Sequence, residues 1–211
     1  MQLVGQYDSP YVRRVAISLT LLGLPFERNT ISVFADADEM RRINPLGRIP
    51  SLILDDGEVL LDSAAILDHI DETVGSELAL MPARGAERRR ALRIVALATG
   101  AIDKAGAIVY ERTLRPADKI YPAWIERCGG QLAGALDALE ALARSPWLMG
   151  GRLMQPDITV AVMLGYLRLR VADALPAGRY PGLERLCDTC EDLPAFLATR
   201  PTPDETMPSG L

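Results

Sequence analysis

The chain is poor in residues that mark several specialised classes of protein. Its 211 residues include only three cysteines and one histidine. An odd cysteine count in a chain of this length does not make the disulfide framework of a small secreted protein. The formal net charge is -5 at pH 7, whereas a nucleic-acid-binding surface needs a basic excess. We therefore expect neither a disulfide scaffold nor a nucleic-acid partner.

Long hydrophobic runs are also missing. The longest nearly apolar stretch, ITVAVMLGYL at residues 158–167, has ten residues, whereas a bilayer-spanning helix needs about 20. The N-terminal sequence MQLVGQYDSP lacks the basic start and apolar core of a signal peptide. We therefore expect no membrane partner and a cytoplasmic location.

Two segments of different character follow each other along the chain. Residues 1–76 predict a strand, a helix and a second strand, then a hairpin at Asp56-Gly57 and another helix. From residue 86 onward helical periodicity dominates and strand-like runs are rare. We predict an α/β domain at residues 1–76, a linker at 77–85 and an all-helical domain at 86–211. The tail from Pro201 is expected to be a loose end.

The first predicted helix begins at Pro10, directly after Ser9. Serine is a favoured N-cap, and proline suits the first position of a helix. A purely structural role is therefore the simplest interpretation of Ser9. A hydroxyl at a helix N-terminus could also donate a hydrogen bond to the sulfur of a bound thiol, where the helix would favour the thiolate.

Two further features lie in the stretch GRIPSLILDDGEVLLDSAAILDHI, residues 47–70. Pro50 stands at the start of a strand, where a residue without an N–H is tolerated. If the Ile49-Pro50 bond is cis, the Ile49 backbone could instead pair with an extended peptide. Asp62 and Ser63 stand at the start of a helix, where either can be the N-cap. The same pair would also suit the ammonium and carboxylate groups of an amino acid.

Together these features resemble the glutathione transferase family, specifically its serine-type cytosolic members. YDSPYVRRV, residues 7–15, is similar to the active-site loop and first helix of that family. NPLGRIPSL, residues 44–52, is similar to the segment that carries its cis-proline. The resemblance covers essentially the whole chain. It implies a thioredoxin-like N-terminal domain followed by an all-helical C-terminal domain, and a homodimer.

The resemblance also implies the roles of the site residues. Ser9 would be the catalytic residue that stabilises the thiolate of glutathione, the co-substrate, with no metal involved. Arg48 would reach the glycyl carboxylate, and Asp62 with Ser63 would hold the γ-glutamyl end. The whole predicted glutathione-binding set is Ser9, Arg48, Ile49, Pro50, Asp62 and Ser63.

A second-substrate pocket is a further implication of the resemblance. Its candidate residues are Tyr11, Phe34, Tyr110, Arg112 and Tyr166. Each aromatic residue among them could equally be ordinary core. If Arg112 faces the pocket, acidic electrophiles would be favoured.

The implied activity is conjugation of reduced glutathione to a small electrophile, as in detoxification. Two alternatives stay open. Serine-type relatives include glutathione-dependent isomerases, and the same fold serves non-catalytic binding and regulatory proteins. The complete set of Ser9, Pro50, Asp62 and Ser63 favours glutathione binding over a scaffold role.

Other motifs predict no chemistry of their own. Cys187 and Cys190 have CxxC spacing, but they lie in a predicted helix near the C-terminus without a second pair or a nearby histidine. We expect ordinary thiols there, as for Cys128, and a packing or solvated role for His69. Met154 stands where the family usually has a serine or threonine cap, which predicts a helix start weaker by roughly 1 kcal/mol.

Overall fold

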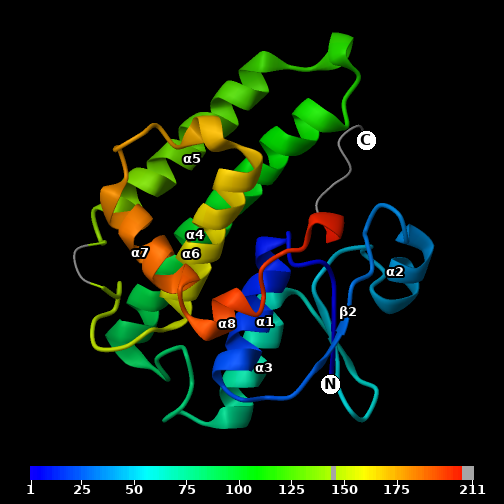
Figure 1. Cartoon of the computed structure of the whole chain (residues 1–211), viewed down its shortest axis with the longest axis vertical. Helices are drawn as coiled ribbons and strands as arrows, with labels where there is room; N and C mark the ends of the chain where they lie inside the picture. The colour runs from blue at the N-terminus through cyan, green and yellow to red at the C-terminus, as the bar shows by residue number, and fades with distance from the viewer. Residues whose placement is uncertain (144–145, 206–211) are drawn as a thin grey trace. The chain divides into compact units, whose positions relative to one another are not determined.

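The structure is a computed structural model, and it describes residues 1–143 and 146–205. The chain divides into two compact units. The first contains Met1–Ala83 and the described residues from Asp192 onward, and the second contains Arg84–Glu191. Figure 1 shows the ribbon of both units, with α1 to α8 and β2 labelled.

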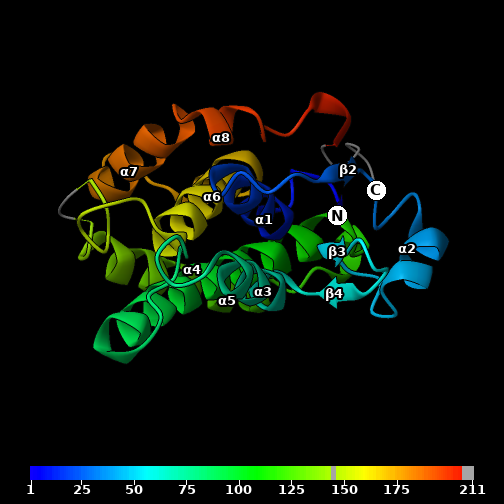
Figure 2. The same ribbon diagram turned by 90° about the horizontal axis from the view of Figure 1, so that it is seen from below.

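A four-stranded sheet forms the centre of the first unit. Its strands are β1 (Gln2–Val4), β2 (Glu27–Asn29), β3 (Ser51–Ile53) and β4 (Val59–Leu61), in the order β2-β1-β3-β4. β1 pairs with β2 in parallel and with β3 antiparallel, and β3 pairs with β4 antiparallel. β3 and β4 are the two sides of the predicted hairpin, and Figure 2 shows them as neighbouring arrows.

The helices of the first unit bury one face against this sheet or against each other. They are α1 (Pro10–Leu21), α2 (Ala37–Ile43), α3 (Ser63–Val74) and α8 (Pro194–Leu197). α1 has an apolar face, on which Val12, Val15 and Leu19 are fully buried. They join Leu3 and Leu52 of the sheet in one hydrophobic cluster, which fixes both ends of α1 relative to β1 and β3.

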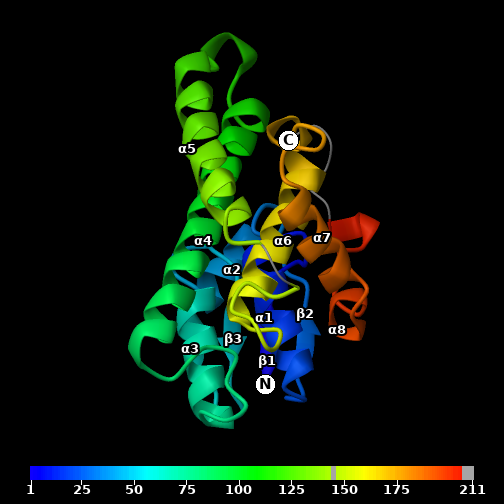
Figure 3. The ribbon, with the colours of Figure 1, turned by 90° about the vertical axis from the view of Figure 1, so that its left-hand side faces the viewer.

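The C-terminal segment corrects the sequence-based division of the chain. Residues 192–205, assigned to the helical domain by their periodicity, belong to the first unit, and α8 packs against α1 (Figures 1 and 3). Pro194 interrupts the helical run, because a proline cannot donate to the preceding turn, and Phe196 is fully buried. The expectation of a loose end from Pro201 is wrong for Pro203–Glu205, which form a 3-10 turn with Glu205 buried. Residues 206–210 of that predicted tail lie outside the described residues.

The second unit is helical. It contains α4 (Gly85–Thr113), α5 (Pro122–Glu140), α6 (Gln155–Arg170) and α7 (Pro181–Glu191), with 3-10 turns at Ala117–Lys119 and Ala172–Ala174. α4 runs beside α5 and packs on α6 (Figure 3). Gly129 and Gly130 lie within α5 and do not break it. The fold class is thus as predicted: a thioredoxin-like domain with a helical domain after it. No helix within residues 1–143 and 146–205 is long and apolar enough to cross a membrane.

The start of α6 keeps half of a capping arrangement. The buried Asp157 carboxylate accepts hydrogen bonds from the Met154 amide at 2.8 Å and from the Leu148 amide at 2.7 Å. Burial raises the pKa of Asp157, although these backbone hydrogen bonds act in the opposite direction. Met154 has no side-chain oxygen that could accept a hydrogen bond from the helix. Through the bond from the Leu148 amide, Asp157 also ties the preceding loop to the start of α6.

Candidate functional site

Ser9 is the N-cap of α1, and its hydroxyl keeps a free hydrogen. The side-chain oxygen accepts the Val12 amide at a long 3.5 Å, and the Ser9 amide donates to the Gln6 carbonyl at 3.2 Å. A hydroxyl that accepts at its oxygen still has its own proton to donate. Ser9 is partly exposed, so this proton is available to a ligand.

The peptide bond between Ile49 and Pro50 is cis, as the resemblance implied. Among the described residues, the Ile49 backbone N–H and C=O have no hydrogen-bond partner. The turn before it is held by the buried Asn44, whose side chain donates to the Arg48 carbonyl at 2.7 Å and accepts the Leu46 amide at 3.0 Å. An extended peptide could therefore pair with Ile49 without displacing a protein hydrogen bond.

Gly5 brings the Ser9 loop against this turn. A Cβ built on Gly5 would lie 2.6 Å from Cγ2 of Val12 and 2.9 Å from Cβ of Ile49. The φ of Gly5 is +133°, a conformation that side chains disfavour. Only a glycine lets the backbone after β1 pass this close to both Ile49 and α1.

Asp62 rather than Ser63 is the N-cap of α3. Its carboxylate accepts the Ala64 amide at 2.8 Å. Asp62 has a φ of +69°, the one positive value for a non-glycine residue in the described part of the chain. Such backbone conformations cost of order 1–3 kcal/mol and cluster at ligand sites. The Asp62 carboxylate is exposed, whereas the adjacent Ser63 is buried.

The hydroxyl of Ser63 is oriented by a residue that the sequence analysis missed. Nη2 of Arg14, on α1, donates to the Ser63 oxygen at 2.7 Å, and both side chains are buried. Burial lowers the pKa of Arg14 to about 10, against the opposing effects of Tyr11 and Asp62. Arg14 therefore stays charged at neutral pH. No local motif relates positions 49 residues apart, and the only hint was a second arginine on an otherwise apolar helix.

Arg48 differs from the rest of the predicted set. Its side chain is exposed, and it has no side-chain partner within the described residues. Arg48 lies directly before Ile49, so its long side chain can place the guanidinium at several positions beside the cis bond. Arg48 is therefore an exposed cation that is not held in one position by a side-chain contact.

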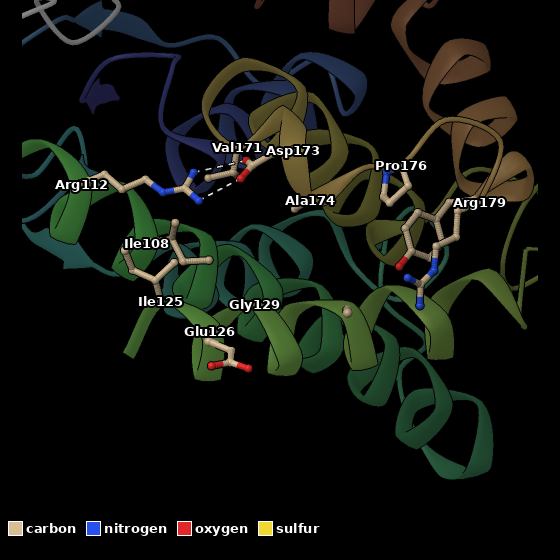
Figure 4. A pocket seen from close by; sticks show the side chains of 12 residues that line it. Ile108, Arg112, Ile125, Glu126, Gly129, Val171, Asp173, Ala174, Pro176 and Arg179 are labelled. Atoms are coloured by element: carbon tan, nitrogen blue, oxygen red, sulfur yellow. Dashed lines mark hydrogen bonds and ion pairs between the residues drawn. The ribbon is translucent and has the colours of Figure 1, made fainter. Parts of the chain in front are cut away.

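The predicted second-substrate residues are spread over both units. Tyr11 and Phe34 are partly buried in the first unit, whereas Tyr110, Arg112 and Tyr166 belong to the second. Tyr110 is 49% exposed. Figure 4 shows a pocket of about 320 Å³ inside the second unit, and Arg112 is the one predicted residue that lines it.

Arg112 is already paired in that pocket. Its guanidinium donates to both carboxylate oxygens of Asp173, at 3.3 and 2.8 Å (Figure 4). The hydrogen bond raises the pKa of Arg112 and lowers that of Asp173. Ile108 and Val171 line the pocket close to this ion pair, and Arg179 lies at its other end (Figure 4). An acidic ligand would have to compete with Asp173 for Arg112.

The cysteines carry no site. Cys128, Cys187 and Cys190 form no disulfide and are fully buried in the second unit. Burial raises the pKa of the Cys190 thiol above its ordinary value, so it is neither a nucleophile nor a ready ligand. No metal-binding group of three or more His, Cys, Asp or Glu side chains occurs among residues 1–143 and 146–205.

Comparison with known proteins places this arrangement in a family. The family model "Glutathione S-transferase, N-terminal domain" matches residues 3–77, and the corresponding C-terminal domain matches residues 122–189. The uncharacterised GST-like protein YibF of Escherichia coli is 32% identical over 203 residues, which cover 95% of this chain and 98% of that protein. The two matched ranges lie in the first and the second unit, respectively. The chain belongs to the glutathione S-transferase family.

Other relatives and solved structures agree with this assignment. Maleylacetoacetate isomerase of Pseudomonas aeruginosa is 28% identical over the whole of both chains. A glutathione transferase family member of Pseudomonas fluorescens, solved with bound glutathione, has a TM-score of 0.85 and 34% identity, covering 95% of this chain and 98% of that one. A Methylobacterium radiotolerans glutathione S-transferase, solved with glutathione sulfonate, has a TM-score of 0.91 and 29% identity, covering 100% and 98%.

Proposed function

We propose that the first unit binds reduced glutathione and that Ser9 stabilises its thiolate for attack on a small electrophile. The observation that carries this proposal is the hydrogen bond from Arg14 to Ser63. Because the Ser63 oxygen accepts from a buried cation, its own proton is directed away from Arg14 and can be donated to a carboxylate. The nearby Asp62 carboxylate can hold an ammonium group, so the pair matches the γ-glutamyl end of glutathione.

The remaining predicted residues fit the rest of the tripeptide. The unpaired backbone of Ile49 can pair with the cysteinyl residue, as a strand does at a sheet edge. Pro50 fixes the direction of that backbone, and the exposed Arg48 can reach the glycyl carboxylate. Binding through these groups leaves the sulfur for Ser9.

The proposed chemistry needs little from the protein beyond positioning. Thiolate, not thiol, is the nucleophile, and a free thiol has a pKa of about 8.5. A hydrogen bond from Ser9 and the N-terminus of α1 both favour the charged form. Holding the thiolate near the electrophile then supplies most of the remaining acceleration.

Calorimetric titration with reduced glutathione tests the binding part of the proposal. We expect saturable binding by the wild type and weaker binding by Ser63→Ala. Ser76→Ala, at an exposed position after α3, is the control and should bind like the wild type. Because Ser63→Ala also removes the acceptor of Arg14, Ser63→Thr should restore affinity if the hydroxyl is what matters. No heat at millimolar glutathione would instead favour a non-catalytic binding or regulatory protein.

A second candidate is a glutathione-dependent isomerase. The relatives named maleylacetoacetate isomerase favour it, since one aligns over the whole of both chains. In this reaction the thiolate adds to a cis double bond, the resulting single bond rotates, and expulsion of the thiolate restores the double bond. Glutathione is regenerated, so mass analysis after turnover separates the two functions. A persistent conjugate supports transfer, and a rearranged substrate with unchanged glutathione supports isomerisation.

The family also supports a homodimer in the cytoplasm, where glutathione is kept reduced. Sedimentation should give about twice the chain mass of 23.0 kDa. A monodisperse species at the chain mass would contradict the dimer without affecting the glutathione site.

A further inference from the structure

The buried carboxylate of Glu205 collects four donors in the first unit. One oxygen accepts the Tyr7 amide at 2.8 Å and forms a short ion pair with Arg28. The other accepts the Thr202 amide at 2.9 Å and the Thr202 hydroxyl at 3.2 Å. Glu205 is 4% exposed. A charged residue so fully buried and so fully satisfied fixes the groups around it.

Arg28 closes this arrangement into a ring of contacts. Its guanidinium carbon lies 3.6 Å from the centre of the Tyr7 ring, while its Nη2 pairs with Glu205. Tyr7 is thus held twice, through its amide by Glu205 and through its ring by Arg28. Tyr7 is also 4% exposed and belongs to the main hydrophobic cluster. Its backbone cannot shift without disturbing both contacts.

Tyr7 lies two positions before Ser9, in the loop between β1 and α1. On the far side of Ser9, the C-terminal segment holds α1 as well: Arg13 donates to the carbonyls of Thr199 at 3.1 Å and Phe196 at 3.2 Å. The C-terminal segment therefore contacts the chain on both sides of Ser9, at Tyr7 and at Arg13.

We propose that Glu205 is a positioning residue that sets where the Ser9 hydroxyl meets the bound sulfur. This inference rests on the proposed role of Ser9. Glu205 contacts the loop of Ser9, whereas the other parts of the site have separate supports: Asn44 holds the turn before Ile49, and Arg14 holds Ser63. Loss of Glu205 should consequently change the pKa of the bound thiol more than the affinity for the tripeptide.

Glu205→Gln is the decisive variant. A glutamine has one acceptor oxygen and one donor NH₂ group, so one of the two donor sets, Tyr7 with Arg28 or Thr202, must face another donor. Asp204→Asn removes the same charge from the neighbouring exposed residue and is the matched control. Both proteins would first be checked for a cooperative thermal melt.

Three measurements separate positioning from a structural role. They are glutathione affinity by calorimetry, the pKa of the bound thiol by ultraviolet thiolate absorbance, and kcat with chlorodinitrobenzene. For Glu205→Gln we expect affinity within about threefold of the wild type, a raised thiol pKa, and kcat lower by about 10-fold or more, the scale of a misplaced catalytic group. Asp204→Asn should match the wild type in all three.

Arg28→Lys is the second variant if Glu205→Gln does not fold. It keeps the charge beside Glu205 but loses the flat stacking on Tyr7, and it should raise the thiol pKa to a lesser extent. An unchanged thiol pKa and kcat in a folded variant would overturn the inference and leave Glu205 a structural residue. Absence of glutathione binding by the wild type would instead refute the proposed function, so the two failures are distinguishable.

Discussion

At the scale of single residues, Arg14 is a buried cation that supports the candidate site by a hydrogen bond to Ser63. Its side chain is 2% exposed, and one guanidinium nitrogen bonds to Ser63. Nε and Nη1 have no hydrogen-bond partner within the described residues, and the group lies 5.8 Å from the Tyr11 ring centre. Burying an incompletely paired cation is costly. Under the proposed function, orientation of the Ser63 hydroxyl is the reason to retain it.

Replacing Arg14 tests this interpretation. Arg14→Met keeps much of the side-chain volume but removes the donor to Ser63. We expect the free energy of glutathione binding to weaken by about 1.5–3 kcal/mol, the scale of one hydrogen bond involving a charged group. The free energy of unfolding should change little or rise, because an apolar replacement avoids the burial of the charge. Calorimetry and urea unfolding measure the two effects. Equal affinities in both proteins would show that Arg14 does not orient Ser63.

Glu205 predicts a specific response to acid. Burial raises its pKa, but hydrogen bonds from Arg28, Thr202 and Tyr7 outweigh burial and hold the pKa below its ordinary value, about 4.3. Its contribution to stability is therefore complete above about pH 4.3 and is lost as the pH falls through the folded-state pKa. The stability difference between wild type and Glu205→Gln should shrink on acidification from about pH 7 to about pH 3. Urea unfolding across this range measures it, and a constant difference would contradict the prediction.

At the scale of elements, the site is assembled where loops meet the ends of α1, α3 and β3. Ser9 and Asp62 cap two helices, and the cis bond precedes a strand. Gly5 links two of these places, since it packs against both Val12 and Ile49. The distance between the Ser9 loop and the Ile49 turn therefore depends on the absence of a side chain at Gly5.

Gly5→Ala should disturb both elements together. The new Cβ would meet Val12 and Ile49 at under 3.0 Å, at a φ of +133°. We expect a loss of about 2 kcal/mol or more in the free energy of unfolding, from overpacking and backbone strain, and weaker glutathione binding because Ile49 moves. Gly57→Ala is the control, because Gly57 has a φ of +90° but nothing within 4 Å of a new Cβ. It should lose some stability and keep its affinity; an equal loss of affinity would refute the packing explanation.

At the scale of the whole molecule, the chain returns to its first unit after the helical one is complete. The sequence predicts the strand and helix order and the helix caps, because each depends on residues close together along the chain, whereas the cis-proline was implied by the family resemblance. The Arg14–Ser63 and Tyr7–Glu205 contacts join residues 49 and 198 positions apart. No local pattern encodes them, and the periodicity of residues 192–199 resembles that of any other helix.

Removing the returning segment tests its importance. A chain ending at Glu191 lacks the acceptors of Arg13 and the carboxylate that holds Tyr7. Hydrogen exchange should show lost protection in β1 and α1, with α4 and α6 protected as before, because those helices pack on each other. Unchanged protection in α1 would mean that the segment is dispensable to the first unit.

The three buried cysteines have a practical consequence. All of them lie in the second unit. A protein surrounded by glutathione disulfide is exposed to mixed-disulfide formation, which requires an accessible thiolate. Here the thiols become reactive only when the helical unit opens. The rate at which a thiol reagent labels the native protein therefore reports the opening of that unit alone, without any engineered probe.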